Sequence, residues 1–302
     1  MSLLINKVPK VRGKLVSNAD ISSTSWFKVG GPIELLFIPD DLLDLTEFIE
    51  NLSMEIPIFV IGALSNTLIR DGGVKGIGIK LDEKFSKIKI NNDYIEVGAS
   101  LLNMKFAKYA QTKQVYGYEF LSGIPGTIGG SIKMNAGCYG REMSDILHEV
   151  TIIDRINGLC NLSSKKLNMT YRNTKVSRDN IIISAKLKYY KDNISSINKL
   201  NIKEERIKSQ PINKLTGGST FKNPKGYKAW KLIEDAGCRG LSLGGAKVSE
   251  MHTNFIINYK NATANDIEAL GNIVRQKVYE NSGIKLEWEI LKIGFSNKGS
   301  IS

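Results

Sequence analysis

The stretch "GYEFLSGIPGTIGGSIKMNAGCYG", residues 117–140, is the most glycine-dense part of the chain and the best indication of its architecture. Six glycines lie from Gly123 to Gly140, with Ser, Thr and Asn among them. Glycine loses more conformational entropy than other residues in a packed strand or helix, so this density predicts a long, mostly uncharged loop. We favour a loop that lets the backbone approach a ligand over a plain irregular one. It has no Walker lysine and no clean GxGxxG at a strand-to-helix turn, which argues against a standard Rossmann site.

Two further loops combine glycine with small polar residues. "GALSNTLIRDGG", residues 62–73, follows a buried strand predicted over 56–62, and the N–H groups at the carboxyl end of such a strand commonly bind a phosphate. In "TGGSTFKNPKG", residues 216–226, a glycine pair lets the backbone approach a ligand, and Lys222 and Asn223 can hold oxyanions. For each loop the alternative is a segment that merely turns the chain.

The first two thirds of the chain alternate strand and helix signals. An apolar strand ends at Pro39, and Asp40 or Asp41 can cap a helix over 42–52. A second helix begins after Ser100. The residues expected on its inner face are Leu102, Phe106, Tyr109 and Ala110. Further strands are predicted at "GIGIKL", "YIEVGAS", "EVTIID", "GLCNLS" and "NIIISAKLKYY".

From residue 193 onward the chain enters a further domain. The polar stretch 193–209 predicts a connecting helix. A short helix follows in "YKAWKLIEDAG" and should end at Gly237. The residues expected to face inward from it are Trp230, Ile233 and Ala236.

The C-terminal part predicts a long helix and a last strand. Thr263 and Asp266 form a capping box for a helix that should end at Gly283. The residues expected on its inner face are Ile267, Leu270, Val274 and Val278. In the strand "KLEWEILKIG", residues 285–294, one face should carry Leu286, Trp288 and Ile290, and the other Glu287, Glu289 and Leu291.

Composition limits the class of protein. The chain has 302 residues, 42% of them hydrophobic, which is enough for two or three domains. It shows neither a signal peptide nor a run of roughly 20 apolar residues that could span a membrane, so we expect a cytoplasmic protein without a membrane partner. Three scattered cysteines and two histidines are too few for a disulfide framework, a metal centre or a recognisable Ser-His-Asp triad. We therefore expect no metal.

Two charged residues stand in apolar company, Arg172 in "TYRN" and Glu289 in "EWEI", although each alone is typical of an exposed charge. Taken together with the loops, they belong to a series of motifs that resembles one family, UDP-N-acetylenolpyruvoylglucosamine reductase, the MurB family of bacterial cell-wall synthesis. The seven motifs, in chain order, are "SWFKVGGP", "GALSNTLIRDGG", "FLSGIPGTIGGSIKMNAG", "YRNTK", "GGSTFKNP", "GGAKVSEMHTNFIIN" and "LEWEI". The chain length resembles the shorter type of the family, which lacks an extra substrate loop.

The resemblance implies an α+β fold. It consists of a two-part FAD-binding fold of the vanillyl-alcohol-oxidase (PCMH-type) kind, followed by a C-terminal α+β substrate domain. The domains implied are FAD-binding subdomain 1 over 1–75, completed by the last strand at about 284–295, subdomain 2 over 76–195, the substrate domain over 196–283 and a flexible tail over 296–302.

The same resemblance implies FAD, bound without a covalent link, and NADPH as the reductant. The pyrophosphate of FAD needs converging N–H groups, which the first two glycine loops can supply. The residues assigned to the cofactor in this way are Gly62, Ala63, Leu64, Ser65, Asn66, Thr67, Gly123, Pro125, Gly126, Thr127, Gly129, Gly130, Ser131, Asn135, Ala136 and Gly137.

The family's reaction assigns roles to individual residues. Hydride from the flavin reaches the enolpyruvyl methylene of UDP-N-acetylglucosamine enolpyruvate, and negative charge builds up on the substrate carboxylate. Arg172 matches the arginine that stabilises this charge, and Glu289, when protonated, can share that role as a hydrogen-bond donor. Ser219 matches the proton donor to the enolate carbon. The substrate-binding residues implied are Tyr171, Lys222 and Asn223, the last two for the diphosphate.

Three positions depart from the family's usual residues. Leu64 and Thr67 stand where relatives more often have Gly and Leu, and Trp288 stands where they often have Pro or a polar residue.

Two other functions remain as alternatives. One alternative is an FAD-linked oxidase of alcohols or sugars, which has no need of Arg172, Ser219 and Glu289 together. The other is a nucleic-acid-binding protein, suggested by the net charge of +12. Because the lysines are spread along the chain, we expect no nucleic-acid partner. We also expect a monomer.

Overall fold

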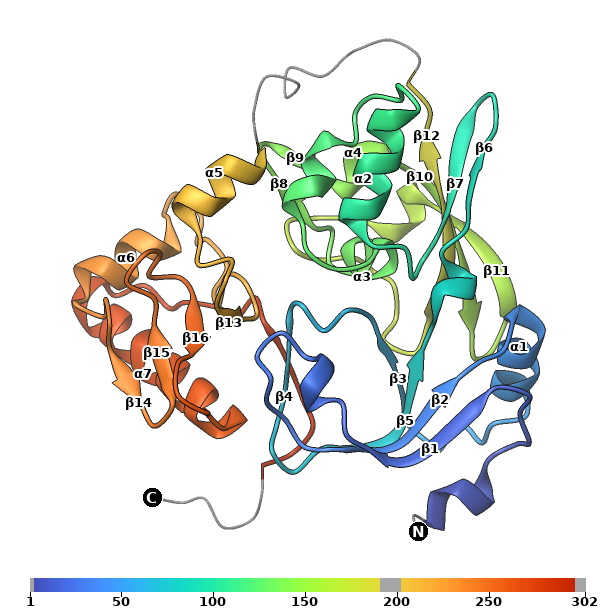
Figure 1. Ribbon diagram of the computed structural model, residues 1–302, viewed down its shortest axis with the longest axis horizontal. Coiled ribbons are helices and arrows are strands. Elements are labelled where there is room, and N and C mark those ends of the chain that lie inside the picture. Colours follow the sequence, from blue (N-terminus) through green and yellow to red (C-terminus); the bar gives the residue numbers. More distant parts are fainter. Residues whose placement is uncertain (1–2, 191–201, 297–302) are drawn as a thin grey trace. The chain divides into compact units, whose positions relative to one another are not determined.

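The computed structural model describes residues 3–190 and 202–296, which form two compact units (Figure 1). Each unit is assembled from three separate segments of the chain. Unit 1 comprises Met1–Asn18, Glu34–Ala63 and Gly76–Glu205, and unit 2 comprises Ala19–Ile33, Leu64–Lys75 and Arg206–Ser302. The N-terminal quarter of the sequence therefore contributes to both units.

The first sheet of unit 1 has the strand order β1-β2-β5-β3. Its strands are β1 (Lys14–Ala19), β2 (Ile33–Ile38), β3 (Ile58–Ile61) and β5 (Val74–Lys80). Helix α1 (Leu42–Glu50) begins after Asp41, whose carboxylate accepts a hydrogen bond from the N–H of Asp44 at 2.8 Å. The predicted helix and its cap are thus confirmed. The helix buries Phe48 against Phe37 of β2, with the ring centroids 4.2 Å apart.

The second sheet of unit 1 is antiparallel, in the order β11-β10-β12-β7-β6. Its strands are β6 (Ile88–Ile90), β7 (Tyr94–Gly98), β10 (Leu147–Asp154), β11 (Gly158–Ser163) and β12 (Ile181–Lys188). The other elements of the unit are α2 (Asn103–Thr112), α3 (Ile128–Lys133), α4 (Met143–Ile146), the short strands β8 (Gly137–Cys138) and β9 (Arg141–Glu142), and the 3-10 helices η1 (Leu3–Lys7), η3 (Glu83–Phe85), η4 (Glu119–Gly123) and η5 (Ser164–Leu167).

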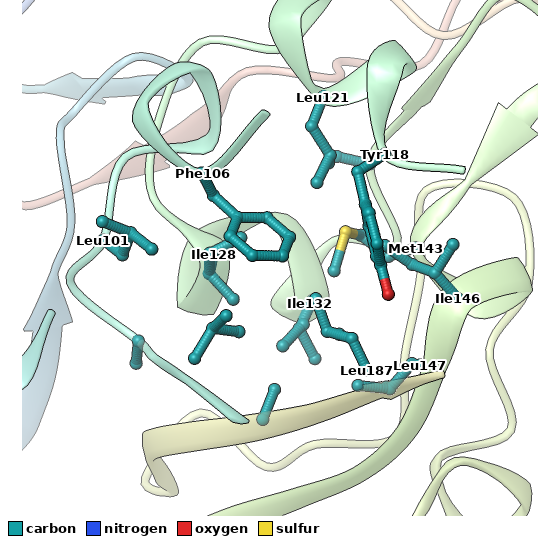
Figure 2. Close-up of a cluster of buried hydrophobic side chains, with 14 of the residues drawn as sticks. Leu101, Phe106, Tyr118, Leu121, Ile128, Ile132, Met143, Ile146, Leu147 and Leu187 are labelled. Carbon is teal, nitrogen blue, oxygen red and sulfur yellow. The ribbon is translucent and has the colours of Figure 1, made fainter. Parts of the chain in front are cut away.

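Helices α2, α3 and α4 meet this sheet in one apolar core (Figure 2). Phe106 of α2, Ile128 of α3 and Met143 of α4 are fully buried there. The ring of Tyr118 joins them, and its hydroxyl donates to the carbonyl of Lys188 at the end of β12. Burial raises the pKa of this hydroxyl above its ordinary value.

The glycine-dense stretch is not one long loop, as its composition predicted. It contains η4 and α3, and α3 includes the glycine pair Gly129 and Gly130. Thr127 caps α3, because its Oγ1 accepts from the N–H of Gly130 at 3.2 Å. Burial of Ile128 and Ile132 offsets the low helix propensity of glycine. Tertiary packing therefore overrides local propensity here.

Unit 2 contains an antiparallel sheet in the order β13-β16-β15-β14 and a parallel pair, β4 and β17. The bounds are β4 (Thr67–Ile69), β13 (Leu215–Thr216), β14 (Ser242–Leu243), β15 (Ala246–Val248), β16 (Ile256–Asn258), β17 (Leu291–Ile293), α6 (Ala229–Asp235), α7 (Ala264–Ser282) and η2 (Ser22–Thr24), while α5 spans Ile202–Ser209. The predicted capping box of α7 is present, its expected inner face is buried, and Gly283 ends it with a φ of +71°.

Three details of the predicted elements are wrong. Trp230 is 42% exposed, because α6 begins only at Ala229 and turns Leu232 and Ile233 inward instead. Leu102 is the exposed N-cap residue of α2 and not part of its inner face. The last strand is limited to β17, although Leu286 and Ile290 are buried as the alternation predicted.

The predicted α+β class is confirmed by these separate helices and largely antiparallel sheets. The predicted connecting helix is present as α5, whereas residues 193–201 and the tail beyond 296 lie outside the described residues. The division into two flavin subdomains and a substrate domain stays a prediction. In the described part of the chain, no helix combines the length and apolar character that a membrane span requires.

Candidate functional site

Ser219 follows β13 in unit 2, in a turn that begins with two glycines. Gly218 has a φ of +82°, which favours glycine, and an added Cβ there would meet no atom within 4 Å. At Gly217 an added Cβ would lie 2.4 Å from the ring of Phe27, so the ring and the backbone touch. Ser219 is half-buried, and among the described residues its hydroxyl has no hydrogen-bond partner. The Ser219 hydroxyl is thus unengaged, and it lies next to Gly218, whose backbone is not covered by other atoms.

The segment that carries Glu289 runs alongside this turn. The N–H of Glu289 donates to the carbonyl of Thr220 at 2.9 Å. The side-chain amide of Asn66 donates to the carbonyl of Glu289 at 3.0 Å. Three residues that the sequence assigned to the site, Ser219, Glu289 and Asn66, therefore lie on neighbouring backbone segments of unit 2.

Lys222 and Asn223, which were assigned to a diphosphate, have partners within unit 2. Lys222 Nζ lies 3.4 Å from the carboxylate of Glu287, whose side chain is 76% exposed, so this ion pair is weak. The Oδ1 of Asn223 accepts from the N–H of Ala229 at 2.9 Å, at the start of α6. The lysine can exchange its partner for an anion at little cost, whereas Asn223 also fixes the start of a helix.

Arg172 lies in unit 1, at the tip of a tight turn. Thr170 and Asn173 exchange two backbone hydrogen bonds of 2.9 and 3.0 Å, which leaves Tyr171 and Arg172 at the tip. Arg172 has a φ of +54°, a conformation that costs a residue with a side chain roughly 1–2 kcal/mol. Its guanidinium donates to the carbonyl of Gly137 at 2.9 Å. The strained turn therefore holds the guanidinium against the end of the glycine-dense stretch.

Asn135, which was assigned to the cofactor, braces this turn from inside unit 1. Its side chain is fully buried, and its Nδ2 donates to the carbonyl of Thr170 at 3.0 Å. Its Oδ1 accepts from the N–H of Ser144 at 2.9 Å. Both ends of the amide are thus used on the protein's own backbone, which ties the turn of Arg172 to α4.

Four of the six glycines assigned to the cofactor fall into two groups. Gly123 and Gly137 are packed against protein, since an added Cβ would lie 2.9 and 2.5 Å from the nearest atoms. At Gly62 and Gly130 an added Cβ would meet only Thr127 Oγ1, at 3.3 and 3.4 Å. Two exposed glycines from distant parts of the sequence therefore lie beside one threonine, with too little room for a side chain between them and its hydroxyl.

The loop after β3 leaves backbone donors available. Among the described residues, the N–H groups of Ala63, Leu64 and Ser65 donate to no acceptor. Leu64 has a φ of +52° and is 7% exposed. This left-handed conformation favours glycine, the residue that the resemblance led us to expect at this position. Leucine retains the conformation here while its side chain is buried.

The end of the same motif, "RDGG", has a structural role that the sequence analysis missed. Arg70 grips Glu268 of α7 through two hydrogen bonds of 2.7 and 2.9 Å, and Lys292 of β17 lies 2.9 Å from the same carboxylate. The hydrogen bonds from Arg70 lower the pKa of Glu268 to about 2. The carboxylate of Asp71 accepts from the first two N–H groups of α7, each at 2.9 Å. The signal in the sequence was a charged pair directly after a buried strand.

Trp288, which the resemblance set apart from the residues expected of the family, is accommodated by a glycine within α7. An added Cβ at Gly271 would lie 2.2 Å from the indole, so any side chain at 271 would clash. The indole also packs against Phe221, with the ring centroids 5.1 Å apart, and Lys292 Nζ lies 4.3 Å above it. The aromatic ring therefore fills the space between the helix and the segments of Ser219 and Glu289.

Two family models match the chain. The model "FAD binding domain" matches residues 33–161. The model "UDP-N-acetylenolpyruvoylglucosamine reductase, C-terminal domain" matches residues 210–293. The first match contains the glycine-dense stretch and the loop after β3, and the second contains the segments of Ser219 and Glu289.

Curated relatives match over nearly the full chain. A UDP-N-acetylenolpyruvoylglucosamine reductase from Bradyrhizobium sp. is 45% identical over 290 residues, which cover 95% of this chain and 94% of the relative. The enzyme of that name from Rickettsia prowazekii is 44% identical and is covered over 98% of its length.

A solved structure is similar as well. The crystal structure of UDP-N-acetylenolpyruvylglucosamine reductase (MurB) from Thermus caldophilus superposes with a TM-score of 0.80 at 29% sequence identity and covers 94% of this chain and 100% of its own. Together with the FAD-binding model, this match confirms the predicted flavin fold. The chain therefore belongs to the UDP-N-acetylenolpyruvoylglucosamine reductase family.

Proposed function

We propose how this chain's own residues divide the work of its family's reaction. The chain is an FAD-dependent oxidoreductase that reduces UDP-N-acetylglucosamine enolpyruvate to UDP-N-acetylmuramate with NADPH, a step of peptidoglycan precursor synthesis. The observation that carries our assignment of roles is the unengaged hydroxyl of Ser219, on a turn whose backbone is bonded to the segment of Glu289.

The residues present fit FAD. Gly62 and Gly130 are exposed and have no side chain, which allows close approach to their backbone. The N–H groups after β3 lack acceptors in the described chain, as suits a pyrophosphate. When bound, FAD would supply the hydride-transfer chemistry that links NADPH to the enolpyruvyl methylene. Thr127 orients α3 beside these glycines through its cap. The remaining predicted cofactor residues, including Asn135, keep that role as part of the proposal.

Arg172 stabilises the charge that develops on the substrate carboxylate. A guanidinium presents two parallel N–H donors to a carboxylate and stays charged at all relevant pH values. Glu289, in its protonated form, donates to the same developing charge. Both groups act on the enolate-like state more strongly than on the neutral enolpyruvyl group, which is the requirement for accelerating the reaction.

Ser219 gives the proton that completes the reduction. The enolate carbon is strongly basic, so it can take a proton from a hydroxyl that is a weak acid in water. The hydroxyl has no protein partner among the described residues, so no competing hydrogen bond must be broken. Gly218, which has no side chain and no atom near its Cβ position, lets the turn approach the substrate carbon.

Lys222, Asn223 and Tyr171 bind the rest of the substrate. The exposed pair of Lys222 with Glu287 opens easily for a diphosphate. Tyr171, which is 47% exposed at the tip of the Arg172 turn, offers a phenol to the substrate.

We further propose that the protein acts as a monomer in the cytoplasm, without nucleic acid or membrane as a partner. We also propose that its domains follow the three-part division of the sequence analysis.

A visible spectrum tests the reaction directly. Purified protein in an anaerobic cuvette should show a flavin band that bleaches with NADPH and returns when UDP-N-acetylglucosamine enolpyruvate is added. Bound flavin that this substrate does not reoxidise would point to another FAD-linked oxidoreductase. Absence of bound flavin, together with DNA affinity that falls steeply with salt, would revive the nucleic-acid alternative.

The variant Ser219→Ala tests the proton donor. We expect flavin reduction by NADPH to stay within about twofold, and reoxidation by the enolpyruvyl substrate to slow by about 10²- to 10⁴-fold, the usual contribution of a positioned proton donor. Stopped-flow absorbance measures the two half-reactions separately. Equal loss in both would make Ser219 a structural residue.

A further inference from the structure

The motif "GGAKVSEMHTNFIIN" of unit 2 contains a buried polar residue with no assigned role, Asn254. Asn254 lies just before β16 and is 4% exposed. A buried amide needs partners for both its oxygen and its nitrogen, because an unpaired polar group in the core costs about 1–3 kcal/mol. The hydrogen-bond partners of the Asn254 side chain indicate its role.

Both partners of the Asn254 side chain belong to one residue, Phe221. The Oδ1 of Asn254 accepts from the N–H of Phe221 at 3.0 Å, and its Nδ2 donates to the carbonyl of Phe221 at 2.8 Å. The amide thus bonds the Phe221 backbone in both directions, as a neighbouring strand would. Phe221 is 1% exposed, so neither of its backbone groups can readily turn to water instead.

The backbone of Asn254 extends the same clamp by one residue toward Ser219. The N–H of Thr220 donates to the carbonyl of Asn254 at 2.8 Å. Thr220 Oγ1 accepts from the N–H of Ile256 at 3.1 Å, and Thr220 is fully buried. The residue directly after Ser219 is therefore fixed at its N–H, its carbonyl and its side chain, whereas the residue directly before it is the flexible Gly218.

We propose that Asn254 is a positioning residue for Ser219, an inference that rests on the proposed role of Ser219 as proton donor. On its C-terminal side Ser219 adjoins the fixed residue Thr220, whereas Gly218 separates it from the anchored strand β13. Asn254 supplies the side-chain part of the C-terminal tether. Without the amide, the turn can pivot about Gly218, and the hydroxyl moves relative to the substrate carbon. Displacement by about 1 Å, or loss of an outer-shell partner, typically slows a reaction by about 10- to 100-fold.

The test compares Asn254→Ala with Asn258→Ala in the FAD-loaded enzyme. Asn258 of β16 is a matched control, because its amide also bonds backbone, donating to Phe27 at 2.9 Å and accepting from Ala262 at 2.8 Å. We expect Asn254→Ala to slow substrate-driven reoxidation about 10- to 100-fold, with flavin reduction within about twofold. Asn258→Ala should lower the melting temperature without separating the two half-reactions.

The double variant Ser219→Ala with Asn254→Ala separates positioning from general damage. If Asn254 acts through the serine hydroxyl, its removal should slow reoxidation by less than about threefold once that hydroxyl is gone. An equal factor in both backgrounds would overturn the inference. If Ser219→Ala alone leaves reoxidation unchanged, the proposed function of Ser219 fails instead, whatever Asn254 does.

Hydrogen exchange gives a readout that does not depend on activity. The amides of residues 220–222 should exchange faster in Asn254→Ala and at the wild-type rate in Asn258→Ala. Should Asn254→Ala fail to fold, Asn254→Asp keeps the size and the acceptor but removes the donor to the Phe221 carbonyl, and the same measurements apply. Unchanged exchange with unchanged reoxidation in that variant would also contradict the proposal.

Discussion

The turn of Arg172 in unit 1 and the turn of Ser219 in unit 2 both present a proposed catalytic side chain, but they are held differently. The first closes on itself through Thr170 and Asn173, and the strained positive φ falls on Arg172 itself. In the second, the positive φ falls on Gly218, and Ser219 has none. The first closes through backbone bonds of its own and is braced by Asn135, whereas the bonds that hold the second all come from distant parts of the sequence.

This difference shows two ways to place a reactive group. At Arg172 the side chain and the strain occupy one residue, so the surrounding bonds must overcome a cost of roughly 1–2 kcal/mol. In unit 2 a glycine takes the unusual conformation at no steric cost, so the next residue remains unstrained but can pivot. The Ser219 turn therefore depends on distant supports such as Asn254 and the segment of Glu289.

Among the variants compared here, removal of the Arg172 guanidinium from the unit 1 turn should have the largest effect on the reaction rate. We expect Arg172→Ala to slow reoxidation by the enolpyruvyl substrate about 10²- to 10³-fold, which corresponds to about 3–4 kcal/mol of transition-state stabilisation. Arg172→Lys keeps the charge but loses the two-pronged grip, so it should recover only part of the rate. Stopped-flow reoxidation measures both. Full activity in Arg172→Lys would mean that charge alone is needed.

The supports of unit 2 include a charged cluster, and this predicts a pH dependence. Glu268 has a folded-state pKa of about 2, below its ordinary value of 4.5, owing chiefly to the hydrogen bonds from Arg70. A lowered carboxyl pKa stabilises the fold above pH 4.5, and this contribution disappears as the pH falls toward 2. We expect Glu268→Gln to lose about 2–3 kcal/mol of unfolding free energy at pH 7.

The same cluster offers its own control. The difference between wild type and Glu268→Gln should shrink as the pH falls from 4.5 to 2, because protonated glutamic acid resembles glutamine. Urea unfolding at a series of pH values measures it. A difference that stays constant over this range would mean that packing, and not charge, is what Glu268 contributes between β4, β17 and α7.

The sequence predicted most elements with strong periodicity or caps. The helix α7 matched its prediction in its capping box, inner face and end, because all three signals agree locally. Helix α3 was missed, because its glycine pair reads as loop and only burial of Ile128 and Ile132 in the core makes it helical. The last strand was too long, because alternation of burial continues where strand pairing does not.

For the site, the motifs identified candidate residues. They did not show which atoms of those residues are accessible to a ligand and which already bond or contact the protein. Gly62 and Gly137 look alike in the sequence, yet Gly62 is exposed, with one side-chain atom near its Cβ position, and Gly137 is packed against backbone. Asn135 and Asn254 bond backbone far away in the sequence, at Thr170 and Phe221, and no local pattern reveals such partners. Contacts of this kind arise only when the whole chain is folded.

The smallest expected effect tests where the strain lies. Gly218→Ala places a side chain at a φ of +82° with no clash at Cβ, so it should cost about 1 kcal/mol of unfolding free energy through the backbone alone. The same order is expected at Arg172, where Arg172→Gly should equal or exceed Arg172→Ala in stability by up to about 1 kcal/mol. Denaturant midpoints of the four proteins, wild type included, measure both differences. If alanine were the more stable residue at both positions, both turns would relax without strain, and the contrast between a strained arginine and an unstrained serine would not hold.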